Sequence, residues 1–168
     1  MKKFYFSVCF ITVLTLILHS CSTSEEDYVD ITKESRLSNP IYSPVKFDFS
    51  QVPLPKLSDY HFFIGPMKNM TPGYKVIPYA PASSLFTDYA LKKRFIWMPE
   101  GVKANYVADN QPLDFPVGTV LIKSFYYNTI QPGNTTKIIE TRLMIRNADG
   151  WKFYEYLWNE AQTDADLV

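Results

Sequence analysis

Alternation of apolar and polar positions is clearest in the last third of the chain. Residues 119–127 and 138–146 are rich in β-branched and aromatic side chains, and residues 151–158 alternate between two sets of large side chains. Such segments are typical of β-strands. The turn signals Pro132-Gly133-Asn134 and Asn147-Ala148-Asp149-Gly150 separate them. The pattern therefore predicts a three-stranded antiparallel meander.

The two-residue period of a strand assigns these side chains to faces. It places Ile139, Thr141, Leu143 and Ile145 on one face of the middle strand, and Ile138, Glu140, Arg142, Met144 and Arg146 on the other. Both faces are then partly apolar, so we expect the sheet to be covered on both sides. The predicted fold is mainly β, an antiparallel β-sandwich or partial barrel with long Pro-rich loops and one or two short helices.

Shorter segments precede the meander. Residues 45–49 alternate briefly, and residues 52–57 contain two prolines, which lack the amide donor that a central strand needs. We expect this segment to form an extended arm along the domain. Ser58 to Phe63 predict one helical turn that is capped by Ser58 and ends at Gly65-Pro66.

Two further elements are expected between the arm and the meander. Residues 83–90 predict a short helix or a tight loop, because Leu85, Phe86 and Tyr89 can pack it. Residues 94–98 read as a strand, and residues 103–107 as a second strand. The turn signal Pro99-Glu100-Gly101 between them predicts a hairpin.

The first twenty residues differ from the rest. Lys2 and Lys3 precede an apolar run that ends at Leu18, which is too short to span a bilayer and is typical of an export signal. Leu18-His19-Ser20-Cys21 matches the pattern read by bacterial lipoprotein signal peptidase. We therefore expect residues 1–20 to be a signal peptide, and Cys21 to carry the acyl chains that hold the protein on a lipid bilayer.

The residues after Cys21 have nothing to bury. Ser22-Thr23-Ser24-Glu25-Glu26-Asp27 is polar and acidic, which is typical of a solvated linker and also resembles the export signal of bacterial surface lipoproteins. We expect a tether over residues 21–44 and a single β-rich domain over residues 45–168, incomplete at its C-terminus if the chain is truncated. The expected location is the cell envelope, on the periplasmic or the outer side of the outer membrane.

Charge and sulfur content exclude several function classes. The chain has 17 basic and 17 acidic residues, so removal of Lys2 and Lys3 with the signal leaves a net charge of −2, and nothing suggests binding of nucleic acid. Once Cys21 is lipidated, the mature domain has no free thiol and a single imidazole, that of His61. A Cys/His zinc site, a cysteine nucleophile and a covalent haem of the C-x-x-C-H type are therefore excluded.

Candidate chemistry lies on the last two strands. Two carboxylates beside arginines can orient a polar ligand or act as acid and base, and the weak catalytic candidates are Glu140, Arg142 and Glu160. Arg146, Glu155 and Asn159 belong to the same constellation, with Tyr126 near by. The alternative is cross-strand ion pairing, which any exposed sheet face displays.

Two other sets of side chains have a functional and a structural interpretation. His61 is either a packed or surface imidazole or a non-covalent haem ligand. Several aromatic residues can stack against sugar rings or can simply form the core: Trp97, Tyr126, Tyr127, Trp151, Tyr154, Tyr156 and Trp158.

Segments along most of the chain resemble a family of exported bacterial proteins, described in part as diheme c-type cytochrome-like. They include Pro53-Leu54-Pro55-Lys56-Leu57-Ser58-Asp59-Tyr60, Leu85-Phe86-Thr87-Asp88-Tyr89-Ala90, Glu140-Thr141-Arg142-Leu143 and the residues from Trp158 to Ala165. Residues 115–123 and 150–156 are similar, more weakly, to cytochrome P460-type domains, which are antiparallel β folds.

The resemblance implies haem only in longer family members, where a C-x-x-C-H segment follows the part that resembles Trp158 to Ala165. This chain has no such segment, so no haem is expected in it. It then represents either a truncated member or a front half, with a redox protein or the missing C-terminal half as its partner.

The function expected from these observations is that of a membrane-anchored bacterial lipoprotein domain without catalysis. The alternative is a ligand- or carbohydrate-binding domain of the cell envelope, with hydrolysis less favoured. The alternative requires a concave pocket at Glu140, Arg142 and Glu160.

Overall fold

Eight β-strands and three short 3-10 helices make up the computed structural model, which describes residues 43–83 and 89–168. These residues belong to one compact unit of the chain. The fold is mainly β, with a six-stranded and a two-stranded antiparallel sheet, as the sequence predicts for a sandwich or partial barrel. No helix in the described ranges has the length and apolar character needed to cross a membrane.

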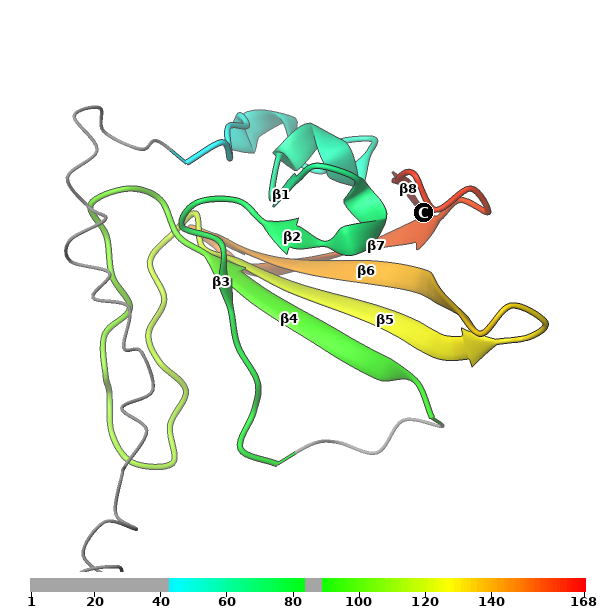
Figure 1. The fold of residues 1–168 in the computed structure, drawn as a ribbon. Coiled ribbons are helices and arrows are strands. Elements are labelled where there is room, and N and C mark those ends of the chain that lie inside the picture. Colours follow the sequence, from blue (N-terminus) through cyan, green and yellow to red (C-terminus); the bar gives the residue numbers. More distant parts are fainter. Residues whose placement is uncertain (1–42, 84–88) are drawn as a thin grey trace, which may run out of the picture. The chain divides into compact units, whose positions relative to one another are not determined.

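The large sheet is a meander in which each strand pairs with the next strand along the chain (Figure 1). Its strands are β3 (Ile77–Pro78), β4 (Leu91–Trp97), β5 (Val120–Ile130), β6 (Thr135–Asn147), β7 (Gly150–Trp158) and β8 (Ala165–Leu167). The predicted three-stranded meander is confirmed as β5, β6 and β7. β-Branched and aromatic side chains give these strands their pleated, half-buried surface.

The remaining elements lie on one face of this sheet (Figure 1). They are β1 (Phe63–Ile64), β2 (Thr71–Pro72), η1 (Phe49–Gln51), η2 (Leu57–Tyr60) and η3 (Met67–Asn69). The predicted arm packs along the core through the buried Val45 and the partly buried Phe47, Val52 and Leu54. We call the sheet face beneath these elements the inner face, and the opposite face the outer face.

The predicted helical turn exists as the single 3-10 turn η2, but its cap differs from the prediction. The Asp59 carboxylate, and not the Ser58 hydroxyl, accepts a hydrogen bond from the Lys56 amide at 3.2 Å. The turn ends at His61, whose φ of 58° is left-handed. Ser58 instead binds the C-terminal segment, so its hydroxyl is used in tertiary contacts.

The core contains a closed polar ring between the arm and the sheet. The Tyr156 hydroxyl donates to the Leu54 carbonyl at 2.8 Å, and the Leu54 amide donates to the Tyr60 hydroxyl at 3.0 Å. The two hydroxyl groups are 2.9 Å apart, so Tyr60 donates to Tyr156. Burial has the largest effect on both hydroxyl groups and raises the pKa of each phenol above its ordinary value. Both tyrosines therefore act as neutral cross-links that hold the arm in register.

A second set of buried polar side chains lies on the inner face of β5, β6 and β7. The Trp158 indole donates to Thr141 Oγ1 at 3.0 Å, and this oxygen lies 2.8 Å from Ser124 Oγ. All three side chains are buried, and each polar atom has a partner. Three of the aromatic residues that can stack against sugar rings are thus core residues: Trp97, Tyr156 and Trp158.

The predicted hairpin of residues 94–98 with residues 103–107 is wrong. Strand β4 pairs instead with β5 over seven residues, and Asn105 forms only an isolated bridge with Asp114. Pairing with β5 buries Phe95 beside Ile122, whereas Tyr106 stays exposed. Strand β4 therefore pairs with the longer, apolar strand β5 and not with the nearer residues 103–107. The predicted helix or loop over 83–90 falls largely on residues 84–88, outside the described residues.

The predicted face assignment of two isoleucines is also wrong. A register shift pairs Phe125 with Glu140 but Tyr126 with Ile138, which leaves Ile139 as an extra residue in β6. Ile138 is consequently buried, and Ile139 is 36% exposed. Such a β-bulge reverses the alternation of side chains on one side of it. From Glu140 onward the predicted alternation holds.

Candidate functional site

Three cations lie side by side on the outer face. Arg94 of β4 is the register partner of Lys123 of β5, and Lys123 is the partner of Arg142 of β6. Glu155 of β7 follows as the partner of Arg142. We call Arg94, Lys123 and Arg142 the cationic row. Since directly opposed residues on neighbouring strands point to the same face, the row crosses the sheet perpendicular to the strands.

Apolar side chains flank the cationic row on both sides. On one side the register aligns Ile96, Leu121, Met144 and Phe153. On the other side lie Phe125 and Leu157, with Glu140 between them. Phe153 is 69% exposed and Leu157 46% exposed. The expectation of a sheet covered on both faces is therefore wrong for this part of the outer face.

Acids balance the cationic row at one end only. Of its three cations, Arg142 has a carboxylate at ion-pair distance in the described part of the chain, that of Glu140 at 2.7 Å. The Lys123 ammonium lies 4.6 Å and the Arg142 guanidinium 5.1 Å from the centre of the Phe125 ring. Burial, followed by repulsion from Arg94, Lys92 and Arg142, lowers the pKa of Lys123. The uncompensated positive charge of the row therefore lies at Arg94 and Lys123.

The two carboxyl groups of the site influence each other. The side chain of Glu140 is only 15% exposed, and burial raises its pKa, as does the neighbouring carboxyl group of Glu155. Arg142 acts in the opposite direction on Glu140.

A shallow hollow lies at the acidic end of the cationic row. Its volume is about 370 Å³, and Arg142, Phe153 and Glu155 line it together with Leu143 and Tyr154. The hollow thus combines a cation, an exposed aromatic ring and a carboxylate on the outer face. Of the three residues at which the binding hypothesis places a pocket, only Arg142 lines this hollow, and Glu140 and Glu160 do not.

Glu160 is separated from the other two catalytic candidates. Its carboxylate binds the Lys137 ammonium at 2.9 and 3.0 Å and is almost fully exposed. Asn159 binds the Thr163 hydroxyl and amide within the turn that leads to β8. The structure therefore brings Glu140, Arg142 and Glu155 together, but places Glu160 and Asn159 in a separate turn.

Two other members of the predicted constellation have separate contacts. The Arg146 guanidinium lies 6.0 Å from the centre of the Trp151 ring, which also contacts Phe115. Tyr126 packs against the core, and the Lys93 ammonium lies 5.9 Å from its ring centre. Neither residue belongs to the hollow.

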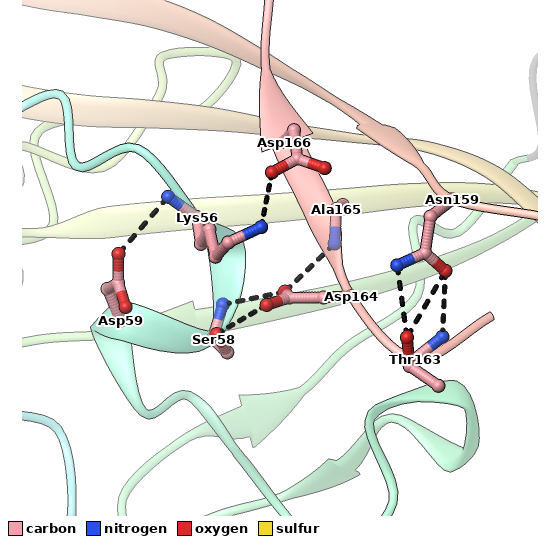
Figure 2. Close-up of polar contacts among 8 residues, drawn as sticks. All are labelled: Lys56, Ser58, Asp59, Asn159, Thr163, Asp164, Ala165 and Asp166. Carbon is pink, nitrogen blue, oxygen red and sulfur yellow. Dashed lines mark hydrogen bonds and ion pairs between the residues drawn. The ribbon is translucent and has the colours of Figure 1, made fainter. Parts of the chain in front are cut away.

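The polar residues near the C-terminus serve the structure. Figure 2 shows the Asp164 carboxylate accepting hydrogen bonds from the Ser58 amide at 3.1 Å, the Ser58 hydroxyl at 2.6 Å and the Ala165 amide at 2.8 Å. Lys56 pairs with Asp166 beside it. These contacts clasp the arm to β8. The conspicuous polar pattern of residues 158–165 is thus explained by folding.

His61 is exposed at the end of η2, and Cys21 falls outside the described ranges. Within residues 43–83 and 89–168, no group of three His, Cys, Asp or Glu side chains is arranged to hold a metal ion.

Sequence reasoning missed the part of the site that lies on β4 and β5. Arg94, Lys123 and Phe125 had no assigned role, because the pairing of β4 with β5 was not foreseen. The alternation Lys92, Arg94, Ile96 against Leu121, Lys123, Phe125 was the available signal. The chain matches no known family model, no curated protein and no solved structure.

Proposed function

We propose that this chain is a lipid-anchored, non-catalytic binding protein of the bacterial cell envelope, and that it holds an anionic ligand on the outer face of its sheet. The cationic row carries this proposal. Like charges on directly opposed strand positions lower the stability of a sheet. A row of three such cations on an exposed face is readily understood if a negatively charged partner neutralises it.

The positions of the acidic candidates support binding over hydrolysis. Glu140 is ion-paired with Arg142 at 2.7 Å. Glu160 is held by Lys137 in a different turn, so the two candidate carboxylates do not face one site.

The anchor is proposed from the sequence at Leu18 to Cys21. In a bacterial host, the wild-type chain should incorporate labelled palmitate and sediment with outer membranes. The Cys21→Ser variant should incorporate no label and leave the membrane fraction. Labelling of the Cys21→Ser variant would overturn the proposed anchor.

Binding of anions can be tested on the mature chain from residue 21 with Cys21→Ser. Although its net charge is negative, we expect retention on a sulfonate resin at pH 7, because the cationic row presents a local positive surface. Replacement of Arg94, Lys123 and Arg142 by Gln should abolish retention. The matched control replaces the exposed Lys46, Lys68 and Lys103 by Gln. Equal losses in both triple variants would contradict a specific surface.

The partner implied by the family resemblance, a redox protein or the C-terminal half of a longer relative, stays a separate prediction to which no surface of the sheet is assigned. Haem remains a prediction for longer family members only.

A further inference from the structure

We propose that the anionic ligand is an acidic polysaccharide, in which successive sugars carry carboxylate groups. This inference rests on the proposed function and specifies its ligand. Three features of the outer face favour an acidic polysaccharide: the hollow, the spacing of the cations, and the acids at one end of the row.

The hollow at the end of the row matches the groups of one acidic sugar. The Arg142 guanidinium presents a planar set of donors that binds carboxylates in a bidentate manner. The exposed ring of Phe153 offers an apolar surface to the C–H face of a pyranose. The Glu155 carboxylate accepts hydrogen bonds, so it can bind sugar hydroxyl groups. An inorganic anion would use only the first of these groups.

The spacing of the cationic row extends this site to several sugars. Neighbouring strands lie about 4.8 Å apart, so Arg94, Lys123 and Arg142 form a line of regularly spaced cations. This spacing is close to the length of one pyranose along a chain. A polysaccharide that crosses the strands can therefore present carboxylates to the cations of the row.

An anionic bilayer fits the face less well. An anionic bilayer presents uniform negative charge, which Glu140 and Glu155 at one end of the row would repel. A linear ligand that places its hydroxyl groups at Glu155 avoids this repulsion.

The test is calorimetric titration of the mature Cys21→Ser chain with oligogalacturonate, and with its methyl-esterified form, tripolyphosphate and phosphatidylglycerol vesicles as separate probes. We expect binding of oligogalacturonate and at least about tenfold weaker binding of the neutral ester, as the loss of charge-assisted hydrogen bonds predicts. Tighter binding of tripolyphosphate or of vesicles would overturn the inference.

Phe153→Ala separates this inference from the proposed function. It should weaken oligogalacturonate binding about tenfold, since it removes a contact that only a sugar makes, but should keep retention on the sulfonate resin. Tyr106→Ala is the matched control, because Tyr106 is also 69% exposed and lies away from the row. Unchanged affinity of the Phe153→Ala variant would overturn the sugar site alone. Loss of resin retention in the wild type would instead overturn the proposed function.

Discussion

Replacement of Lys123 by Met should stabilise the domain and at the same time impair binding. Lys123 has a cation as its register partner on each side, Arg94 and Arg142. Opposed like charges cost about 0.2 to 1 kcal/mol per pair, so removal of the central charge relieves about 0.4 to 2 kcal/mol. The lost contact of the ammonium with Phe125 costs about 0.5 to 1 kcal/mol, part of which the sulfur–aromatic contact of Met restores. With mid-range values, a relief of about 1.2 kcal/mol and an unrestored aromatic loss of about 0.5 kcal/mol, we expect a net gain of about 0.7 kcal/mol.

The assay is urea unfolding followed by tryptophan fluorescence, since Trp97 and Trp158 are buried. The gain should be present in about 10 mM salt, where the Debye length is about 30 Å, and should vanish in about 1 M salt, where it is about 3 Å. Lys137→Met is the control, because Lys137 is paired with Glu160 and its loss should be neutral or slightly destabilising. A Lys123→Met variant that is less stable at both salt concentrations would refute the view that the row is strained by repulsion.

Three further predictions concern the framework and the carboxyl pair. Tyr156→Phe leaves the Leu54 carbonyl without a donor, so it should lower the free energy of unfolding, measured in urea, by about 2 to 3 kcal/mol. A loss below about 0.5 kcal/mol would contradict the role of the polar ring. Asp164→Ala should release η2, seen as faster amide hydrogen exchange at Ser58, and unchanged exchange there would show that the clasp is unimportant. Folding raises the pKa of Glu140, so the folded state binds more protons than the unfolded state. The stability that this group contributes is therefore present at low pH. It is lost as the pH rises from 4.5 through the raised pKa. Glu140→Gln should remove this part of the pH dependence of the urea midpoint, and an identical pH profile in both proteins would argue against the shift.

The sequence predicted the parts of the fold that depend on local alternation. The meander of β5, β6 and β7 was recognised because its strands are long and its turns carry Gly, Pro and Asn. The bulge at Ile139 was not, because one extra residue in β6 leaves no mark in composition. The pairing of β4 was missed because it depends on competition between two partners, and Phe95 gains more burial beside Ile122.

The candidate site was predicted in part for the same reason. Glu140 and Arg142 lie beyond the bulge, so the period of two placed them correctly on one face. Glu160 was wrongly grouped with them because it follows β7 closely in sequence. The turn after β7 directs its carboxylate to Lys137, and the sequence does not show this. Lys123 and Arg94 join the site only through the long-range pairing of β4 with β5. Sequence spacing alone does not contain that information.

The outer face as the binding surface is the central claim, and NMR mapping tests it most directly. Oligogalacturonate would be titrated into the mature Cys21→Ser chain, labelled with nitrogen-15 and with carbon-13 at its Phe and Lys side chains. We predict that the largest shift changes occur at Arg94, Lys123, Arg142 and Phe153, with a raised pKa of the Lys123 ammonium when the ligand is bound. Shift changes confined to the arm and β1–β2, or no change at saturating ligand, would contradict the account.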